Sequence, residues 1–366
     1  MESPRKNLNI IGVEKQFEFD MVPPNIDKHL EFVEISTDGE LLLGSSNLNG
    51  CYWTGSIWYF LEPGNAPQRE KVYSGLNCDS GICDGKFLSE NKVIIGEDLG
   101  MVSILHLHKD QTFKKEHSKF TVESSRSEHD HAVLSVSVSG DKQKAVTGSM
   151  DKCIKVWDVS SNKDLLSEHT YRPAHKDHVT SVAMKQESSE GSTVFASCSL
   201  DGAALLWDTR MPKPAQVIYE DVAIGLKSVA WYSDNQVVIG STLGELCVAD
   251  TRARGLTFQT IVSSPRPIHR IVVHKNLVAM CADDTYVRVI DMNKLTTSSS
   301  NNDNISRSTG LNTSLTNSTT NPAIIYSDGK HKDYVRGLTW APDSGTLISC
   351  AWDRQVLCHN IGPVIS

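Results

Sequence analysis

Two stretches of the chain that lie 50 residues apart decide the fold: residues 151–158 read Asp-Lys-Cys-Ile-Lys-Val-Trp-Asp, and residues 201–208 read Asp-Gly-Ala-Ala-Leu-Leu-Trp-Asp. Each begins with an aspartate suited to a tight turn, continues as a strand and ends in Trp-Asp. A pattern that recurs in this way indicates a repeated supersecondary unit. One such unit cannot bury both of its faces, so two of them imply a longer series that packs side by side.

This pattern is that of one blade of a WD40 β-propeller. Five weaker copies show the same alternation, at residues 55–60, 100–107, 244–250, 284–291 and 353–359. From the second blade on, the turn positions before these strands are Leu99, Asp151, Asp201, Leu243, Asp284 and Asp353. Most of the intervals lie near the length of a WD40 repeat, about 40–45 residues. The sequence therefore predicts an all-β, seven-bladed WD40 propeller.

One interval is longer than the others because it contains a segment of different composition. Asp284 and Asp353 are 69 residues apart, and 20 of the 26 residues in 296–321 are Ser, Thr or Asn. Such a segment has almost nothing to bury, so we expect a disordered insertion between the third and fourth strands of blade six. Without it, 43 residues remain, which is the length of an ordinary blade.

The two ends of the chain are expected to close the ring together. We assign residues 28–366 to the propeller and residues 1–27 to an N-terminal segment. The chain ends a few residues after the third strand of blade seven, and residues 14–20 alternate as a strand does. We predict that a strand within residues 8–20 becomes the missing fourth strand of blade seven, which would leave few exposed sheet edges.

Composition narrows the classes of function. The formal net charge is −8 and no run of Lys or Arg occurs, so duplex nucleic acid is not an expected partner, whereas basic proteins are. The alternative is that the excess of acidic residues has no role in binding and only keeps the protein soluble. The sequence has no apolar run long enough to span a membrane and no signal peptide. Nine scattered cysteines without a Cys-x-x-Cys pair argue against zinc and indicate a reducing, intracellular compartment.

Sets of His, Ser and Asp recur in the strong blades and could be mistaken for catalytic triads. Near-copies of one triad are too many for one active site, so we interpret them as hydrogen-bond networks inside the blades, completed by the strand tryptophans. No phosphate-binding loop or nucleophile elbow is present, so we predict no enzyme, no catalytic residue, no cofactor and no metal. The residues assigned to these networks are His129, Ser149, Asp151, Trp157, His175, Ser199, Asp201, Trp207, His331 and Asp353.

Blade one contains the best candidate for a partner contact. We expect its second strand to end near Ser46 and its third to start near Ser56, which leaves a long polar loop between them. The loop carries two adjacent aromatic residues, Tyr52 and Trp53, which are predicted to be exposed anchors, with Cys51 and Asn49 beside them. The alternative is that Trp53 folds over the rim and packs locally, as tryptophan often does.

Four segments resemble one particular family beyond the general fold. They are residues 41–60, 207–214 (Trp-Asp-Thr-Arg-Met-Pro-Lys-Pro), 331–340 and 352–356, and they resemble the WD40 subunit of the methylosome, the methylosome protein 50 family. The resemblance extends from about residue 30 to residue 360, without the insertion. It is least clear in the first 25 residues and at the end of blade five, where Ala249-Asp250 replaces Trp-Asp.

The resemblance implies a non-catalytic adaptor that docks on the N-terminal TIM-barrel domain of the type II protein arginine methyltransferase, in a hetero-octamer. It implies that the adaptor helps to present basic substrates, such as histones and Sm-type splicing proteins, for symmetric dimethylation in the cytoplasm and nucleus. It also matches Trp53 to an aromatic residue of the enzyme-facing loop of the family. A substrate receptor of a ubiquitin ligase or a chromatin reader remains the alternative, because propellers serve many functions.

Overall fold

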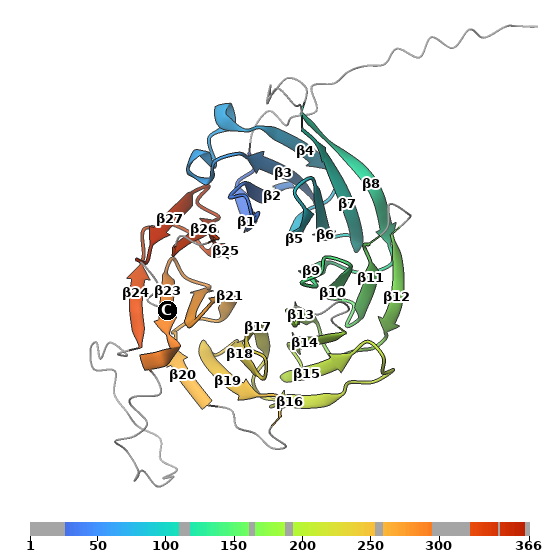
Figure 1. Ribbon diagram of the computed structural model, residues 1–366, viewed down its shortest axis with the longest axis vertical. Coiled ribbons are helices and arrows are strands. Elements are labelled where there is room, and N and C mark those ends of the chain that lie inside the picture. The colour runs from blue at the N-terminus through green and yellow to red at the C-terminus, as the bar shows by residue number, and fades with distance from the viewer. Residues whose placement is uncertain are drawn as a thin grey trace, which may run out of the picture.

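Seven antiparallel sheets form a ring, with the first strand of each sheet nearest the centre (Figure 1). The computed structural model describes residues 26–109, 118–160, 165–186, 193–252, 259–294, 323–342 and 345–362. Within these ranges six sheets have four strands and the last has three, and each sheet is built from strands that are consecutive in the chain. The predicted fold, an all-β seven-bladed propeller, is confirmed.

The strands follow one another from blade to blade. Blade one consists of β1 (His29–Ile35), β2 (Leu41–Asn49), β3 (Tyr52–Phe60) and β4 (Ser74–Cys78), with two short 3₁₀ helices, η1 (Pro63–Asn65) and η2 (Arg69–Lys71), before β4. Blade two consists of β5 (Ile82–Ser89), β6 (Lys92–Glu97), β7 (Met101–His108) and β8 (Lys119–Ser127). Blade three consists of β9 (Val133–Val138), β10 (Lys144–Ser149), β11 (Ile154–Asp158) and β12 (Leu166–Tyr171).

The later blades repeat this arrangement. Blade four consists of β13 (Val179–Met184), β14 (Val194–Ser199), β15 (Ala203–Asp208) and β16 (Gln216–Glu220). Blade five consists of β17 (Leu226–Ser233), β18 (Gln236–Ser241), β19 (Glu245–Asp250) and β20 (Gln259–Ser263). Blade six consists of β21 (Ile268–His274), β22 (Leu277–Ala282), β23 (Val287–Asp291) and β24 (Ile324–Asp328), and blade seven of β25 (Val335–Trp340), β26 (Thr346–Ala351) and β27 (Val356–Asn360).

The core of the molecule lies between the blades. Each blade buries both of its faces, and the buried apolar side chains form seven clusters, one between each pair of neighbouring blades. Strands buried on both faces lose the simple alternation of a half-exposed sheet; all six residues of β22, for example, are buried. Because each cluster needs residues from two blades, no blade is expected to be stable alone.

Blade one packs directly against blade seven, and this contact closes the ring. Leu30 and Val33 of β1 share a buried cluster with Ile348 and Cys350 of β26. The closing strand expected within residues 8–20 falls outside the residues that the structure describes, and it stays a prediction. The disorder expected of residues 296–321 also falls outside the described residues and stays a prediction. The strands that flank this segment, β23 and β24, are paired neighbours in one sheet.

The turns between second and third strands explain why aspartate and glycine recur just before the third strand of a blade. The residue after the predicted turn position has a positive φ in five blades, at Gly100, Lys152, Gly202, Gly244 and Arg354. Glycine is required at some of them, because a Cβ on Gly100 would lie 2.2 Å from the carbonyl oxygen of His129 in the next blade. The turns thus also set how closely neighbouring blades approach each other.

Candidate functional site

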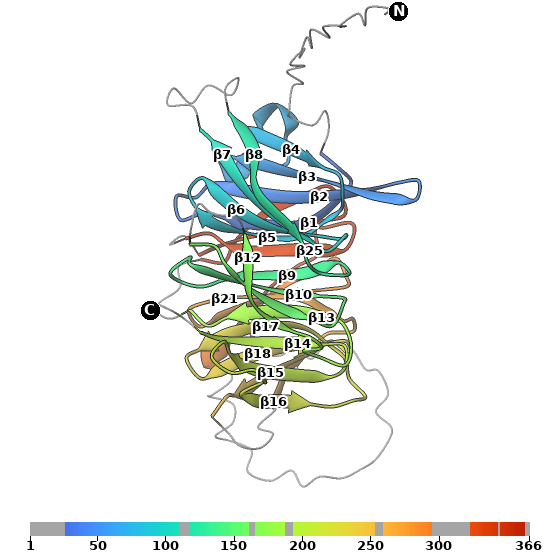
Figure 2. The same cartoon turned by 90° about the vertical axis from the view of Figure 1, so that its right-hand side faces the viewer.

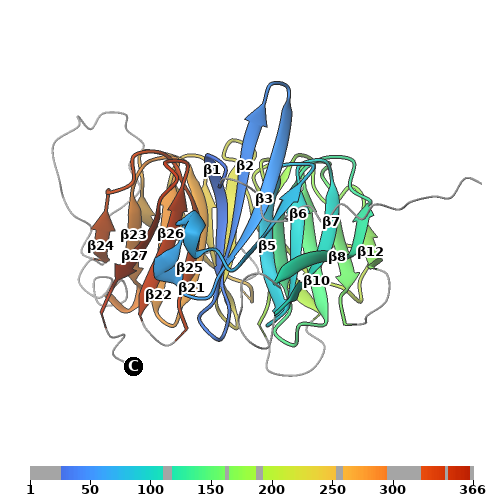
Figure 3. The ribbon, with the colours of Figure 1, turned by 90° about the horizontal axis from the view of Figure 1, so that it is seen from above.

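The second and third strands of blade one form a hairpin that protrudes beyond the ring (Figure 2 and Figure 3). The structure corrects the prediction of a long loop here, because the strands pair without interruption up to Asn49 and Tyr52. Only Gly50 and Cys51 form the turn, and Gly50 has the positive φ, 68°, that the first position of such a turn requires. Continued strand pairing satisfies the backbone of residues 47–55, which a long loop would leave to water.

The side chains near the tip differ in exposure. Tyr52 is 76% exposed and Leu48 is 48% exposed, whereas Trp53 is 38% exposed. The ring of Trp53 contacts His29 edge to face, with 5.6 Å between ring centroids. Trp53 is thus partly exposed, as an anchor would be, and partly packed against its own propeller, as the alternative has it. Cys51 is exposed, and the side chain of Asn49 lies outside what the structure describes. Tyr52 and Trp53 thus present apolar surface to solvent, with Trp53 held in place from one side.

Exposed apolar side chains gather at the hairpin end of the propeller. The loops at this end join second to third strands and fourth to first strands. Together with the hairpin they contribute eight of the exposed large apolar side chains, namely Leu48, Tyr52, Trp53, Leu99, Val222, Leu243, Tyr286 and Tyr334. We call this surface the hairpin face. Exposed apolar residues that gather at one end of a molecule are typical of a protein–protein interface.

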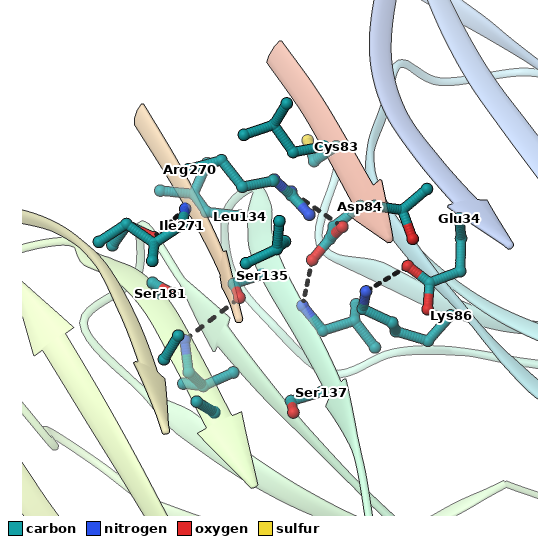
Figure 4. A pocket seen from close by; sticks show the side chains of 18 of the residues that line it. Glu34, Cys83, Asp84, Lys86, Leu134, Ser135, Ser137, Ser181, Arg270 and Ile271 are labelled. Carbon is teal, nitrogen blue, oxygen red and sulfur yellow. Dashed lines mark hydrogen bonds and ion pairs between the residues drawn. The ribbon is translucent and has the colours of Figure 1, made fainter. Parts of the chain in front are cut away.

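A central channel runs between the inner strands, with a cavity volume of about 790 Å³. Arg270 of blade six reaches across it to Asp84 of blade two, with 3.0 Å between guanidinium nitrogen and carboxylate oxygen (Figure 4). The other carboxylate oxygen of Asp84 accepts a hydrogen bond from the backbone N–H of Val136. Glu31 lines the channel on the side of the hairpin face, and burial raises the pKa of its carboxyl to about 7, against the opposing effect of Arg336.

The His and Asp side chains of blades three and four lie inside the blades. In blade three, His129 bonds Asp151 through Nδ1 (2.9 Å) and Thr147 Oγ1 through Nε2 (2.8 Å), and Trp157 donates to the same hydroxyl (2.8 Å). In blade four, His175 and Trp207 share the hydroxyl of Ser197 in the same way, and His175 bonds Asp201. The polar groups of these side chains satisfy one another's hydrogen bonds inside the blade, as is typical of a structural network.

Two predicted members of these networks occupy a different place. Ser149 donates to the backbone carbonyl of His131, and Ser199 donates to that of Asp177. The hydroxyl between His and Trp comes from the residue two positions earlier on the same face of the strand, Thr147 or Ser197. A constant spacing of ten residues to the tryptophan could have revealed this from the sequence.

Blade seven carries a variant of the network that the sequence analysis did not complete. His331 bonds Asp353 and the hydroxyl of Ser349, as its counterparts do. The position of the tryptophan is taken by His359, whose Nε2 lies 2.7 Å from Ser349 Oγ. Blade one has a further variant, in which Trp58 donates to Ser56, and Ser56 donates to Asp27.

The electrostatics of these networks also indicate a structural role. Burial alone would raise the pKa of the Asp151 carboxyl, but hydrogen bonds from His129 and from two backbone amides hold it well below its usual range. The pKa of the Asp201 carboxyl is lowered in the same manner. A carboxylate locked in its charged form and enclosed by fixed donors is a poor proton acceptor. In the described part of the chain, no three His, Cys, Asp or Glu side chains are arranged to hold a metal ion.

Comparisons with known proteins agree with the fold and with the resemblance. A family model for the WD domain, G-beta repeat, matches residues 120–158, 167–208 and 324–360. The chain is 28% identical to methylosome protein WDR77 of Xenopus laevis over 93% of its own length and 91% of that protein. It is 24% identical to protein valois of Drosophila melanogaster over 67% of its length and 68% of that protein. The resemblance to the methylosome WD40 subunit is thereby confirmed. Among the described residues, no helix is both long and apolar enough for a membrane span.

Proposed function

Because this chain is a non-catalytic, seven-bladed propeller of WD40 repeats that resembles a methylosome protein along nearly its whole length, we propose that it is the adaptor subunit of a protein arginine methyltransferase complex. In this role it binds the type II methyltransferase, in a hetero-oligomer such as a hetero-octamer. It helps to present basic substrates, such as histones and Sm-type proteins, for symmetric dimethylation. It acts in the cytoplasm and nucleus.

The protruding hairpin of blade one is the observation that carries the proposal. It presents Tyr52 and Trp53 on a two-stranded support, and aromatic residues are among the side chains that most often dominate binding energy. The contact of Trp53 with His29 limits the conformational freedom that binding would otherwise cost. The hairpin is thus suited to be the anchor for the methyltransferase, with the rest of the hairpin face around it.

A co-purification experiment tests the proposal. The tagged full-length chain is isolated from native extract and assayed for an associated arginine methyltransferase and for symmetric dimethylation of histones. The variants Tyr52→Ala and Trp53→Ala should each weaken association by about 2–4 kcal/mol, as buried interfacial aromatics do. Leu166→Ala is the matched control, since Leu166 is 58% exposed on the outer strand β12, away from the hairpin.

The outcomes separate this function from the alternative. Recovery of a ubiquitin ligase or a chromatin complex in place of a methyltransferase would favour the substrate-receptor or chromatin-reader hypothesis. Full retention of the methyltransferase by both hairpin variants, with the fold intact, would remove the hairpin from the interface. Methyl transfer by the isolated chain would contradict an adaptor role.

A further inference from the structure

The central channel opens on the hairpin face directly beside the aromatic anchor of the hairpin. Trp53 lines the cavity there together with Glu31 of β1, Asp98 of the β6–β7 turn and Trp352 of the β26–β27 turn. Gly81 lies between hairpin and turn, since a Cβ on it would be 3.1 Å from both the Cβ of Trp53 and a carboxylate oxygen of Asp98. We call the part of the cavity lined by Glu31, Trp53, Asp98 and Trp352 the near mouth. A protein that covers Trp53 therefore also faces the near mouth.

Glu31 brings an unpaired carboxyl to the near mouth. The two arginines that attract it are paired with other acids, Arg336 with Asp283 at 3.3 Å and Arg270 with Asp84 at 3.0 Å (Figure 4). Neither comes within ion-pair distance of Glu31 in the described structure. Burial therefore outweighs their attraction, and the pKa of the Glu31 carboxyl stays at about 7. An enclosed acid without a counter-ion opposes folding, and such groups concentrate at functional sites.

Asp98 adds a second carboxyl to this opening. One of its oxygens accepts a hydrogen bond from the backbone N–H of Gly81, at 3.0 Å, and burial raises its pKa against the effect of this and other backbone donors. Burial also raises the pKa of the Cys83 thiol on the same wall of the channel, and both Glu31 and Asp98 add to that rise. The two carboxyls thus act on one small region of the channel wall.

The other groups around the near mouth supply no positive charge for these acids. His29 packs against Trp53 and against Trp352, with 4.8 Å between the latter ring centroids, and burial lowers its pKa. Burial also holds the pKa of His269, beside Arg336, well below its usual range. Nδ1 of His29 is buried without a hydrogen-bond partner among the described residues. Trp352 has the guanidinium of Arg336 over its ring at 4.4 Å, so Trp53 offers the open aromatic surface.

We propose that the near mouth receives a lysine or arginine side chain of the protein that docks on the hairpin, with its cation beside Glu31 and Asp98 and its aliphatic part against Trp53. The inference rests on the proposed adaptor function and adds the chemistry of one contact. Such a side chain supplies the missing counter-ion, and its apolar stem suits an aromatic wall. Because the near mouth is continuous with the hairpin, the same partner reaches both.

Proton binding by Glu31 gives this contact a signature in the pH dependence of association. A cation pairs only with the ionised carboxylate, so binding is linked to the loss of a proton. With a pKa of about 7, about a tenth of the Glu31 carboxyls are ionised at pH 6 and about nine tenths at pH 8. The affinity for the partner should therefore rise about tenfold from pH 6 to pH 8.

The experiment uses the full-length chain and the methyltransferase that co-purifies with it. The dissociation constant is measured by biolayer interferometry at pH 6, 7 and 8, for the wild type, Glu31→Gln and Asp98→Asn. Glutamine removes an acid that opposes folding at pH 8, so a loss of binding there would not arise from unfolding. Asparagine keeps an oxygen for the N–H of Gly81. Glu90→Gln is the matched control, because Glu90 is exposed in the β5–β6 turn, at the other end of the blade.

We expect Glu31→Gln to lose about tenfold in affinity at pH 8, to match the wild type near pH 6 and to show no rise between them. Asp98→Asn should weaken binding at pH 8, and Glu90→Gln should bind as the wild type does. Wild-type affinity and pH dependence in Glu31→Gln would overturn the proposal and leave the adaptor function standing. Loss of histone binding alone, with the methyltransferase retained, would assign the near mouth to a substrate and also overturn it. Failure of the wild type to recover any methyltransferase would refute the proposed function, and the inference with it.

Discussion

Thr147→Val is the substitution that most directly tests the structural interpretation of the His–Asp networks. Thr147 is fully buried; its hydroxyl accepts the indole N–H of Trp157 and donates to His129, whose other ring nitrogen bonds Asp151. Valine has nearly the same shape but leaves both partners buried without a hydrogen bond. Each such group costs about 1–3 kcal/mol, and the added buried methyl group returns about 1 kcal/mol, so the free energy of unfolding should fall by about 1–5 kcal/mol.

Urea denaturation at pH 7, followed by tryptophan fluorescence and by circular dichroism, measures this loss. Coincident transitions for the two probes are needed before a free energy of unfolding is assigned to so large a protein. Thr37→Val is the control, because Thr37 is exposed in the turn between β1 and β2. If Thr147→Val changed the free energy no more than Thr37→Val does, the network would not be a structural element, and its histidine would need another explanation.

Three further predictions concern charge and ring closure. The pKa of Asp151 is lower in the folded state than in the unfolded state, where it is about 4, so this carboxylate stabilises the fold above about pH 4 and the contribution is lost as pH falls. Between about pH 4 and pH 2, Asp151→Asn should therefore lose less free energy of unfolding than the wild type. Parallel curves of free energy against pH for the two proteins would contradict this. Burial raises the pKa of the Glu31 carboxyl to about 7, so above the pH at which this carboxyl ionises in the unfolded chain it opposes folding. Glu31→Gln should therefore be more stable than the wild type by about 1–3 kcal/mol at pH 8 and equal to it near pH 4. Deletion of residues 1–22 should lower the melting temperature cooperatively if a strand within residues 8–20 pairs with blade seven, and an unchanged thermal melt would refute that closure.

The strand pattern made much of the fold predictable. Third strands were expected at residues 100–107, 244–250 and 353–359, and β7, β19 and β27 lie there. Alternation within a strand and a turn before it are local properties, so they can be read without knowing what packs against the strand. The strand tryptophans assigned to the blade networks, Trp157 and Trp207, are almost fully buried.

What the sequence by itself determined is therefore the repeat: the number of blades, their order and the side chains that each blade buries. Packing decided which hydroxyl completes each network, since Thr147 and Ser149 lie on the same face of one strand and alternation does not distinguish them; in the sequence only the spacing of ten residues to Trp157 marks Thr147. It also decided that residues 47–55 continue the strand pairing as a projecting hairpin, and that Arg270 meets Asp84 across the channel, 186 residues away in the chain. Such contacts depend on closing the ring, which brings distant blades face to face, and no local pattern encodes that distance.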